Sequence, residues 1–239
     1  MRSEAFETLF GGAAGGGKSH GQLLDALRFA VVYPGSRQLM LRRTMPELER
    51  SLVPAAMRLY PQSVASYKVS EHRWDFINGS TLEFGYCDAE SDVTKYQSAE
   101  YDVIRFDELT HFTESQFTYL ISRIRGANPY PKQVKSTTNP GGIGHQWVKS
   151  RYIDPMPPDE VHAFDGETRL FLPARLAEIR FCARPMPGTK SGCVCSPCTT
   201  GARCSTACGS WMRDGISPSS PPPCISCRRT RSRANGGAI

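Results

Sequence analysis

The sequence contains no long apolar run. None of its segments reaches the roughly 18 apolar residues that a membrane-spanning helix needs, so no membrane span is expected. The first ten residues also lack the basic start and apolar stretch of a secretory signal. The 239 residues, 39% of them hydrophobic, suffice for one domain with a packed core or for two small ones. We therefore expect a soluble intracellular protein.

An excess of positive charge is missing from most of the chain. Residues 1–178 contain 20 Lys and Arg against 22 Asp and Glu, whereas residues 179–239 contain 9 against 1. The formal net charge of +6 therefore comes entirely from the C-terminal segment. An argument for nucleic-acid binding from overall basicity therefore depends on this segment alone.

The C-terminal segment, residues 179–239, also lacks the material of a core. No leucine follows Leu176, and Leu, Ile, Val and Phe make up six of these 61 residues, well under the roughly 20% below which chains are typically disordered. Seven prolines and eight of the nine cysteines lie here. Such a segment cannot bury enough apolar surface to offset its chain entropy. We predict a folded domain in residues 1–178 and a disordered Cys/Pro/Arg-rich tail in residues 179–239.

Three interpretations of this tail remain open. A zinc module would use its thiolates, but only Cys195/Cys198 and Cys224/Cys227 have the C-x2-C spacing of paired ligands. A disulfide framework would need an oxidising compartment. The third interpretation is translation out of frame. Residues 179–182 can be encoded so that the neighbouring frame reads Asn-Pro-Phe-Leu, which would continue Leu176-Ala177-Glu178 as an ordinary helix end and turn.

Residues 1–178 alternate between strand and helix patterns. The apolar periodicity predicts strands at residues 6–10, 38–41, 66–69, 73–77, 81–86, 102–106, 133–137 and 169–172, and helices at 18–32, 45–60 and 115–124. Thr44 is typical of a helix N-cap, and Asn78-Gly79 is typical of a β-hairpin. The alternation predicts an α/β fold with a mostly parallel sheet flanked by helices.

A glycine-rich loop between the first strand and the first helix has the P-loop pattern G-x-x-x-x-G-K-[ST]. Its glycines allow several N–H groups to point at one phosphate, at the positive end of the following helix. The residues expected to bind ATP are Gly12, Ala13, Ala14, Gly15, Gly16, Gly17, Lys18 and Ser19. Lys18 would reach the β- and γ-phosphates, and Ser19 would give a hydroxyl to Mg²⁺. The alternative is a flexible loop with an accidental Lys-Ser pair.

An acidic pair ends the strand predicted at residues 102–106. Asp107 would hold Mg²⁺ through water, and Glu108 would orient or activate the attacking water. The pattern is weak alone and gains weight from the P-loop upstream. Arg105, a charge inside this strand, would face the sheet edge or pair with a carboxylate, and we assign it no function.

The next predicted strand ends in hydroxyl and amide side chains. Thr137, Thr138 and Asn139 would lie beside the phosphate site and could sense the γ-phosphate; a plain turn is the alternative. An arginine from this or a neighbouring subunit could stabilise transition-state charge. The candidate arginine fingers are Arg42 and Arg43, and Arg123 and Arg125 are further arginines that could complete a phosphate site.

With these residues in view, the chain resembles the ATPase domain of the large terminase subunit of tailed bacteriophages. The resemblance lies in residues 9–19, 41–48, 96–102, 106–110 and 136–142, and it covers about residues 6–178. It implies a P-loop NTPase of the RecA-like (ASCE) type and an ATP-driven motor that moves double-stranded viral DNA into a procapsid. The implied partners are the portal protein and the small terminase subunit, within a homo-oligomeric ring in the bacterial cytoplasm. It also implies that the segment matching Thr137, Thr138 and Asn139 couples hydrolysis to DNA movement.

The chain departs from the family in two places. The family continues into a nuclease domain with clustered carboxylates, whereas Asp214 is the only acid after Glu178, so no nuclease activity is expected here. Only ten residues precede Gly11, so the family's adenine-contacting segment is shortened and weaker nucleotide affinity is expected. The alternatives to a working motor are an inactive prophage remnant and another, helicase-like P-loop ATPase that only binds nucleotide.

Overall fold

Residues 3–12 and 17–174 are described by the computed structural model, and they form one sheet with helices on both faces. The strands are β1 Glu7–Gly12, β2 Arg37–Arg42, β3 Ala65–Lys68, β4 Arg73–Phe76, β5 Thr81–Tyr86, β6 Val103–Phe106, β7 Gln133–Thr138, β8 Val161–Phe164 and β9 Glu167–Ala174. The helices are α1 Lys18–Val32, α2 Met45–Leu59, α3 Glu114–Ile121 and α4 His145–Tyr152, with the short 3-10 helices η1 Val69–Glu71, η2 Glu90–Tyr96 and η3 Leu109–His111.

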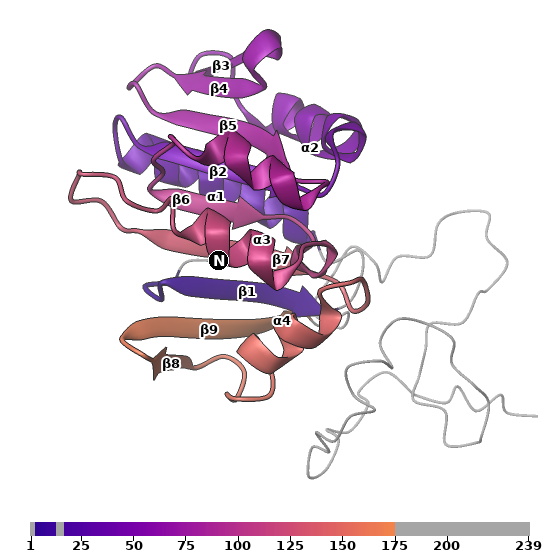
Figure 1. Ribbon diagram of the computed structural model, residues 1–239. Helices are drawn as coiled ribbons and strands as arrows, with labels where there is room; N and C mark the ends of the chain where they lie inside the picture. Colours follow the sequence, from indigo (N-terminus) through magenta and orange to yellow (C-terminus); the bar gives the residue numbers. More distant parts are fainter. Residues whose placement is uncertain (1–2, 13–16, 175–239) are drawn as a thin grey trace, which may run out of the picture.

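The sheet is parallel in its centre and antiparallel at its edges (Figure 1). The strand order is β3-β4-β5-β2-β6-β7-β1-β9-β8. The strands from β5 to β9 in this order pair parallel with one another, whereas the β3–β4, β4–β5 and β8–β9 pairs are antiparallel. This confirms the predicted mostly parallel α/β fold. Strand β7 lies between β1, which precedes the glycine-rich loop, and β6, which precedes the acidic pair.

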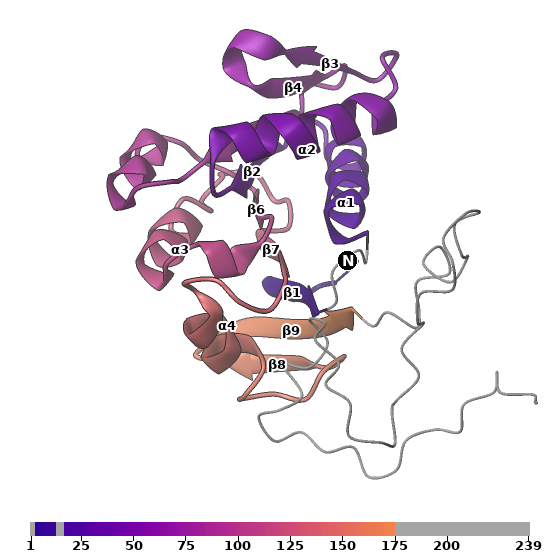
Figure 2. The same cartoon turned by 90° about the vertical axis from the view of Figure 1, so that its right-hand side faces the viewer.

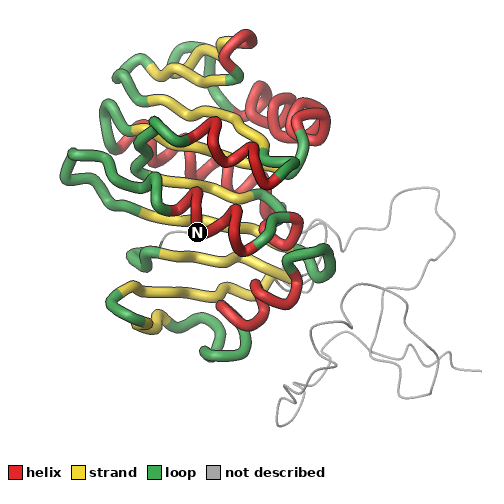
Figure 3. Tube along the Cα trace, viewed as in Figure 1, coloured by secondary structure: helices red, strands yellow, loops and turns green. Residues whose placement is uncertain are grey.

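Two apolar cores lie on opposite faces of the sheet. Alternate residues of a strand point to opposite faces, so Leu39 and Leu41 of β2 join the core under α3 and α4, while Met40 joins the core under α1 and α2. Figure 2 shows α1 on one side of the strands and α3 and α4 on the other. Figure 3 shows the same layering by secondary structure. Burial of each large apolar side chain in these cores contributes about 1.5–3 kcal/mol.

The predicted elements agree closely with the observed ones where the pattern was strong. Helix α1 has the predicted bounds, and α2 begins after Thr44 as predicted, although the Thr44 side chain accepts no capping hydrogen bond. The hairpin at Asn78-Gly79 is confirmed: Gly79 has a φ of 82°, and Asn78 Nδ2 donates to the Ala30 carbonyl at 2.8 Å. The turn thereby also anchors the sheet to the end of α1.

Besides the three 3-10 helices, one α-helix and one strand of the described residues were not predicted from the sequence. Helix α4 is mostly polar and buries only Val148 and Tyr152, so its apolar stripe is too narrow to reveal a helix. Strand β8 is a four-residue edge strand that pairs only with β9 among the described strands. Arg105, for which two placements were open, lies in the central strand β6 and pairs with the carboxylate of Asp25 rather than facing the sheet edge.

The predictions for the C-terminal tail cannot be compared with the fold. Residues 175–239, which include the predicted domain boundary at residue 178 and eight cysteines, lie outside the described residues. Within the described part of the chain, no helix has both the length and the apolar character that crossing a bilayer requires.

Candidate nucleotide-binding site

The candidate site lies at the edge of the sheet where the parallel strands end. Because β1, β2, β6 and β7 are parallel, their last residues meet at one edge, where α1 also begins. Gly12 ends β1 with a φ of 127°, and a Cβ there would lie 2.6 Å from the Ala174 backbone oxygen. Gly17 precedes α1 with a φ of 64°. Both positions therefore favour glycine, and the loop between them, residues 13–16, lies outside the described residues.

One carboxylate oxygen joins the P-loop helix to two strands. Ser19 Oγ donates to Asp107 Oδ1 at 2.8 Å, and Thr137 Oγ1 donates to the same oxygen at 2.7 Å. These side chains come from the start of α1, the end of β6 and the end of β7. The structure thus brings together the hydroxyl and the acid that the sequence predicted as magnesium ligands, with a residue of the predicted coupling segment beside them.

The Asp107 carboxylate is suited to a divalent cation. Asp107 is fully buried, and its Oδ2 has no hydrogen-bond partner among the described residues, although Arg42 Nη1 lies 3.4 Å away. Burial raises the pKa of Asp107, and the Thr137 hydrogen bond, the Arg42 charge and the Ser19 hydrogen bond oppose that rise. A buried carboxylate oxygen beside a serine hydroxyl fits Mg²⁺, which in phosphate sites takes one or two protein ligands together with phosphates and water.

Lys18, the first residue of α1, brings a positive charge to this edge. It is 7% exposed, and burial lowers the pKa of its ammonium group, against the charges of Asp107 and Glu108, which raise it. The ammonium group therefore lies in a partly desolvated place near the acidic pair. A lysine in this environment interacts strongly with added negative charge, such as that of a polyphosphate.

Glu108 is held in an unusual backbone conformation. Its φ of 63° lies in the left-handed region, which costs on the order of 1–3 kcal/mol for a residue with a side chain. The Glu108 N–H donates to Thr137 Oγ1 at 3.3 Å. Its carboxylate is paired with Arg42 Nη2 at 3.0 Å and with His111 Nδ1 at 3.2 Å. Glu108 is partly exposed, whereas its neighbour Asp107 is buried.

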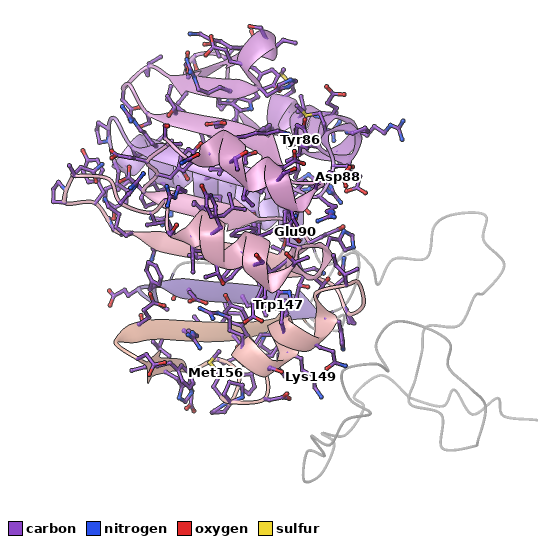
Figure 4. The ribbon with its side chains drawn as sticks, viewed as in Figure 1. Tyr86, Asp88, Glu90, Trp147, Lys149 and Met156 are labelled. Carbon is purple, nitrogen blue, oxygen red and sulfur yellow. The ribbon has the colours of Figure 1, made fainter. Side chains whose placement is uncertain are left out.

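The candidate arginines divide into one near the acids and three elsewhere. Arg42 lies at the end of β2, pairs with both acids of the site and also donates to Ser51 Oγ. Arg43 instead donates to Gln116 Oε1 at 2.9 Å and lies 3.6 Å from Asp88, which Figure 4 labels. Arg123 and Arg125 donate to the Gln97 carbonyl near the amino end of β6, where Tyr101 bridges to Ile124. These two arginines therefore lie at the amino ends of the parallel strands, opposite the candidate site.

The segment after β7 packs onto the segment after Glu108. Thr110 Oγ1 donates to the Asn139 carbonyl at 3.0 Å, and Thr138 Oγ1 donates to Thr110 Oγ1 at 3.2 Å. Gly144 N donates to the Thr110 carbonyl at 2.8 Å. Gly142 has a φ of 91°, and a Cβ there would lie 2.6 Å from that carbonyl. Only glycine allows so close an approach, so the loop between β7 and α4 is pressed against η3.

Helix α4 is attached to the same segment. Trp147, which Figure 4 labels on α4, donates its indole N–H to the Phe112 carbonyl at 3.0 Å. The sequence did not identify Thr110, His111 and Trp147 as neighbours of the site. The positions of Thr110 and His111, two and three residues after the acidic Glu108, were the available signal for them; no sequence signal pointed to Trp147, because α4 was not predicted.

Known proteins resemble this chain in sequence and in fold. Residues 4–171 match the family model described as phage terminase large subunit. Among solved structures, the large terminase of a thermophilic bacteriophage has a TM-score of 0.57 and 17% identity, over 71% of this chain and 40% of that chain. The N-terminal domain of the DNA packaging ATPase from bacteriophage phi29 has a TM-score of 0.50 and 14% identity, over 70% of this chain and 90% of that chain.

These structural likenesses concern the fold, because the identities are low. The chain spans about 40% of the length of the thermophilic phage terminase that it matches. That terminase has also been solved with ADP, with a TM-score of 0.58 and 15% identity, over 72% of this chain and 40% of that chain. A search of curated proteins gives no match to the chain.

Proposed function

The chain belongs to the phage terminase large subunit family, and from that premise we propose that it hydrolyses Mg-ATP to drive the packaging of double-stranded viral DNA. The observation that carries the proposal is the 2.8 Å contact between Ser19 Oγ and Asp107 Oδ1. A serine that begins a helix after a glycine-rich loop and an acid that ends a central strand meet there, as a magnesium–phosphate site needs. The large terminase of the thermophilic bacteriophage has been solved with ADP and with ATP-γ-S, which supports the same ligand here.

The roles of the residues follow from their positions. The N–H groups of the P-loop and the Lys18 ammonium group would bind the β- and γ-phosphates. Ser19 and Asp107 would hold Mg²⁺, which when bound supplies charge stabilisation to the transferring phosphoryl group. Glu108 would orient the attacking water, whose oxygen forms the new bond to phosphorus as the bond to the ADP oxygen breaks, and would accept its proton. Thr137 contacts both Asp107 and the Glu108 N–H, and with Thr138 and Asn139 it would register the loss of the γ-phosphate.

Arg42 is the arginine that the proposal retains near the chemistry. Its guanidinium group already pairs with Glu108 and lies near Asp107, so it is placed to hold the acids rather than to reach into a neighbouring subunit. Arg43 contacts Gln116 and Asp88 instead. We therefore propose that Arg42 holds the two acids of its own subunit and that Arg43 makes no phosphate contact.

The test is phosphate release by the full 239-residue chain together with binding of a fluorescent ADP. Lys18→Ala is expected to lose nucleotide binding, because it removes the charge that neutralises the phosphates. Glu108→Ala is expected to bind ADP normally and to turn over roughly 10²–10⁴-fold more slowly. Glu114→Ala, which removes an exposed acid at the start of α3, is the matched control with normal turnover. Equal activity of the chain, Lys18→Ala and Glu108→Ala would refute the site.

The motor role is a second step that needs its own test. We infer that copies of the chain act as a ring that docks on the portal protein and receives DNA with the small terminase subunit, and family membership supports this inference. With procapsids that carry the portal, the chain should protect DNA from nuclease only when ATP is present. Glu108→Ala should give no protection. Protection without ATP, or with the Glu108→Ala protein, would contradict coupling of hydrolysis to DNA movement.

A further inference from the structure

A buried cluster of charged side chains lies between α1 and the sheet, below the nucleotide site. Asp25 Oδ2 accepts from Arg105 Nη1 at 2.8 Å and from Lys135 Nζ at 2.7 Å. Arg105 also donates to Gln38 Oε1, from Nε at 3.1 Å and from Nη2 at 2.9 Å. Asp25, the most accessible of the four residues, is 7% exposed. We call Asp25, Gln38, Arg105 and Lys135 the Asp25 network, and the proposed hydrolysis uses none of them.

The Asp25 network lies next to the site on α1, β6 and β7, the three elements that bring Ser19, Asp107 and Thr137 together. Arg105 lies two residues before Asp107 on β6, and Lys135 lies two residues before Thr137 on β7. Residues two apart in a strand share a face, so each network residue points to the same side of the sheet as its site residue. Asp25 lies on the same helix as Ser19, less than two turns further along.

A second contact ties the same helix to the same two strands. The buried Gln22 Nε2 donates to the Phe106 carbonyl at 2.9 Å and to the Lys135 carbonyl at 3.2 Å. Gln22 lies between Ser19 and Asp25 on α1, and Phe106 immediately precedes Asp107. The helix is thus held to β6 and β7 at two successive levels below the contact between Ser19 and Asp107.

Stability alone gives little reason for these charges. Removing charged groups from water is costly, and apolar side chains of similar volume often hold a helix against a sheet equally well. The ionic contacts instead fix the position of α1 relative to the strands. Two donors from two different strands converge on one oxygen of Asp25, so α1 cannot slide or rotate without breaking at least one charge-assisted hydrogen bond. An apolar interface would allow such movement at a lower cost.

We propose that the Asp25 network is a positioning device that sets the start of α1 against the ends of β6 and β7, and so fixes the separation of Ser19 from Asp107. The proposal rests on the function proposed above, because it assumes that these two residues hold Mg²⁺ together. Asp25, Arg105 and Lys135 are positioning residues, since none of them is among the side chains that contact Ser19 or Asp107. Their effect should appear in magnesium binding rather than in binding of the nucleotide alone.

The experiment compares ADP binding with and without Mg²⁺, using a fluorescent ADP and the full chain. The main variant is the triple substitution Asp25→Leu, Arg105→Met and Lys135→Met, which removes all three charges at similar volume and should keep the fold. We expect its Kd for ADP without Mg²⁺ to stay within about threefold of the original value, because Lys18 is itself part of α1. The Mg²⁺ concentration that enhances ADP binding should rise roughly 10- to 100-fold, the usual effect of losing groups that orient metal ligands.

Two outcomes would overturn the positioning role. One is unchanged magnesium dependence in a triple variant that melts cooperatively. The other is an equal loss of ADP binding with and without Mg²⁺, which would mean that the network merely supports the P-loop. If the unsubstituted chain bound no ADP under either condition, the proposed function and this inference would both fail, whereas failure in the variants alone would leave the proposed function standing.

A single substitution keeps the test decisive if the triple variant does not fold. Lys135→Met leaves Asp25 paired with Arg105 and with Arg28 of its own helix, and removes only the tie to β7. It should raise the required Mg²⁺ concentration in the same direction by a smaller factor, and no rise would overturn the proposal. Lys132→Met is the matched control, because Lys132 Nζ donates to the buried Asp102 at 2.7 Å at the amino ends of β6 and β7. It should leave the magnesium dependence unchanged.

Discussion

Replacing Thr137 by valine removes a hydroxyl from the centre of the site and leaves the shape of the side chain nearly unchanged. Thr137 is 1% exposed, and its Oγ1 donates to Asp107 Oδ1 at 2.7 Å and accepts from the Glu108 N–H at 3.3 Å. Valine retains the branched shape, so no cavity forms. The substitution therefore isolates the contribution of the two hydrogen bonds.

The size of the effect follows from the charge and burial of Asp107. A hydrogen bond to a charged group contributes about 1.5–3 kcal/mol, and no water replaces it because Asp107 is fully buried. The Thr137 hydrogen bond is also the largest of the influences that hold down the raised pKa of Asp107. We therefore expect kcat to fall roughly 10- to 150-fold, the factor that 1.5–3 kcal/mol represents. The free energy of unfolding without nucleotide should fall by about the same 1.5–3 kcal/mol.

Phosphate release and urea denaturation measure these two quantities. Thr137→Ser is the control, because serine keeps the hydroxyl and loses only a methyl group, so it should retain most of the turnover. A Thr137→Val protein with the original kcat would show that the bond to Asp107 is irrelevant to hydrolysis. A Thr137→Ser protein as slow as Thr137→Val would mean that packing of the methyl group, not the hydroxyl, is what matters.

Three further predictions concern other parts of the structure. Gly12→Ala should destabilise the chain by on the order of 1–3 kcal/mol, because Gly12 has a positive φ and lies close to the Ala174 oxygen. Its control is Gly21→Ala, in open space on α1, which should be neutral or stabilising. Equal melting temperatures of the two variants would contradict the strain argument. Arg42→Gln should lower kcat, while the Kd for ADP without Mg²⁺ stays within about threefold of the original value. Weaker ADP binding with an unchanged kcat would contradict the proposed role of Arg42 in holding the two acids. Burial, with the charge of Arg105, lowers the pKa of Lys135 from 10.5 to about 8. The unfolded chain therefore binds the extra proton between pH 8 and 10.5, and the free energy of unfolding should rise across that window by on the order of 3 kcal/mol. Urea denaturation at several pH values should show this rise relative to Lys135→Met, and parallel pH profiles for the two proteins would refute it.

The fold class and the candidate site residues could be predicted from the sequence because their signals are local. A P-loop is contiguous, and residues 12–19 carry its pattern between a strand and a helix. The alternation of strands and helices, the bounds of α1 and the turn at Asn78-Gly79 likewise depend on neighbours in the chain. The parallel sheet then follows, because alternating strands and helices favour parallel strands joined by helical crossovers.

Long-range contacts were outside the reach of such reasoning. The sequence left two placements open for Arg105, and only the packing of α1 onto β6 shows that Asp25, 80 positions away, is its partner. The sequence also did not show which of the two adjacent arginines lies near the acids. Adjacent residues of an extended chain point to opposite faces of the sheet. In the structure Arg42 faces the acids, while Arg43 turns toward Gln116.

The sequence by itself thus determined that a glycine-rich loop, a lysine and a serine begin a helix, and that an acidic pair ends a strand. Only the tertiary structure decided that Ser19 and Asp107 meet at 2.8 Å, that Thr137 shares the same carboxylate oxygen, and that a layer of buried charge lies beneath them. The physical reason is that local patterns set the conformation of each segment, whereas the distance between two segments depends on how the whole sheet and its helices pack.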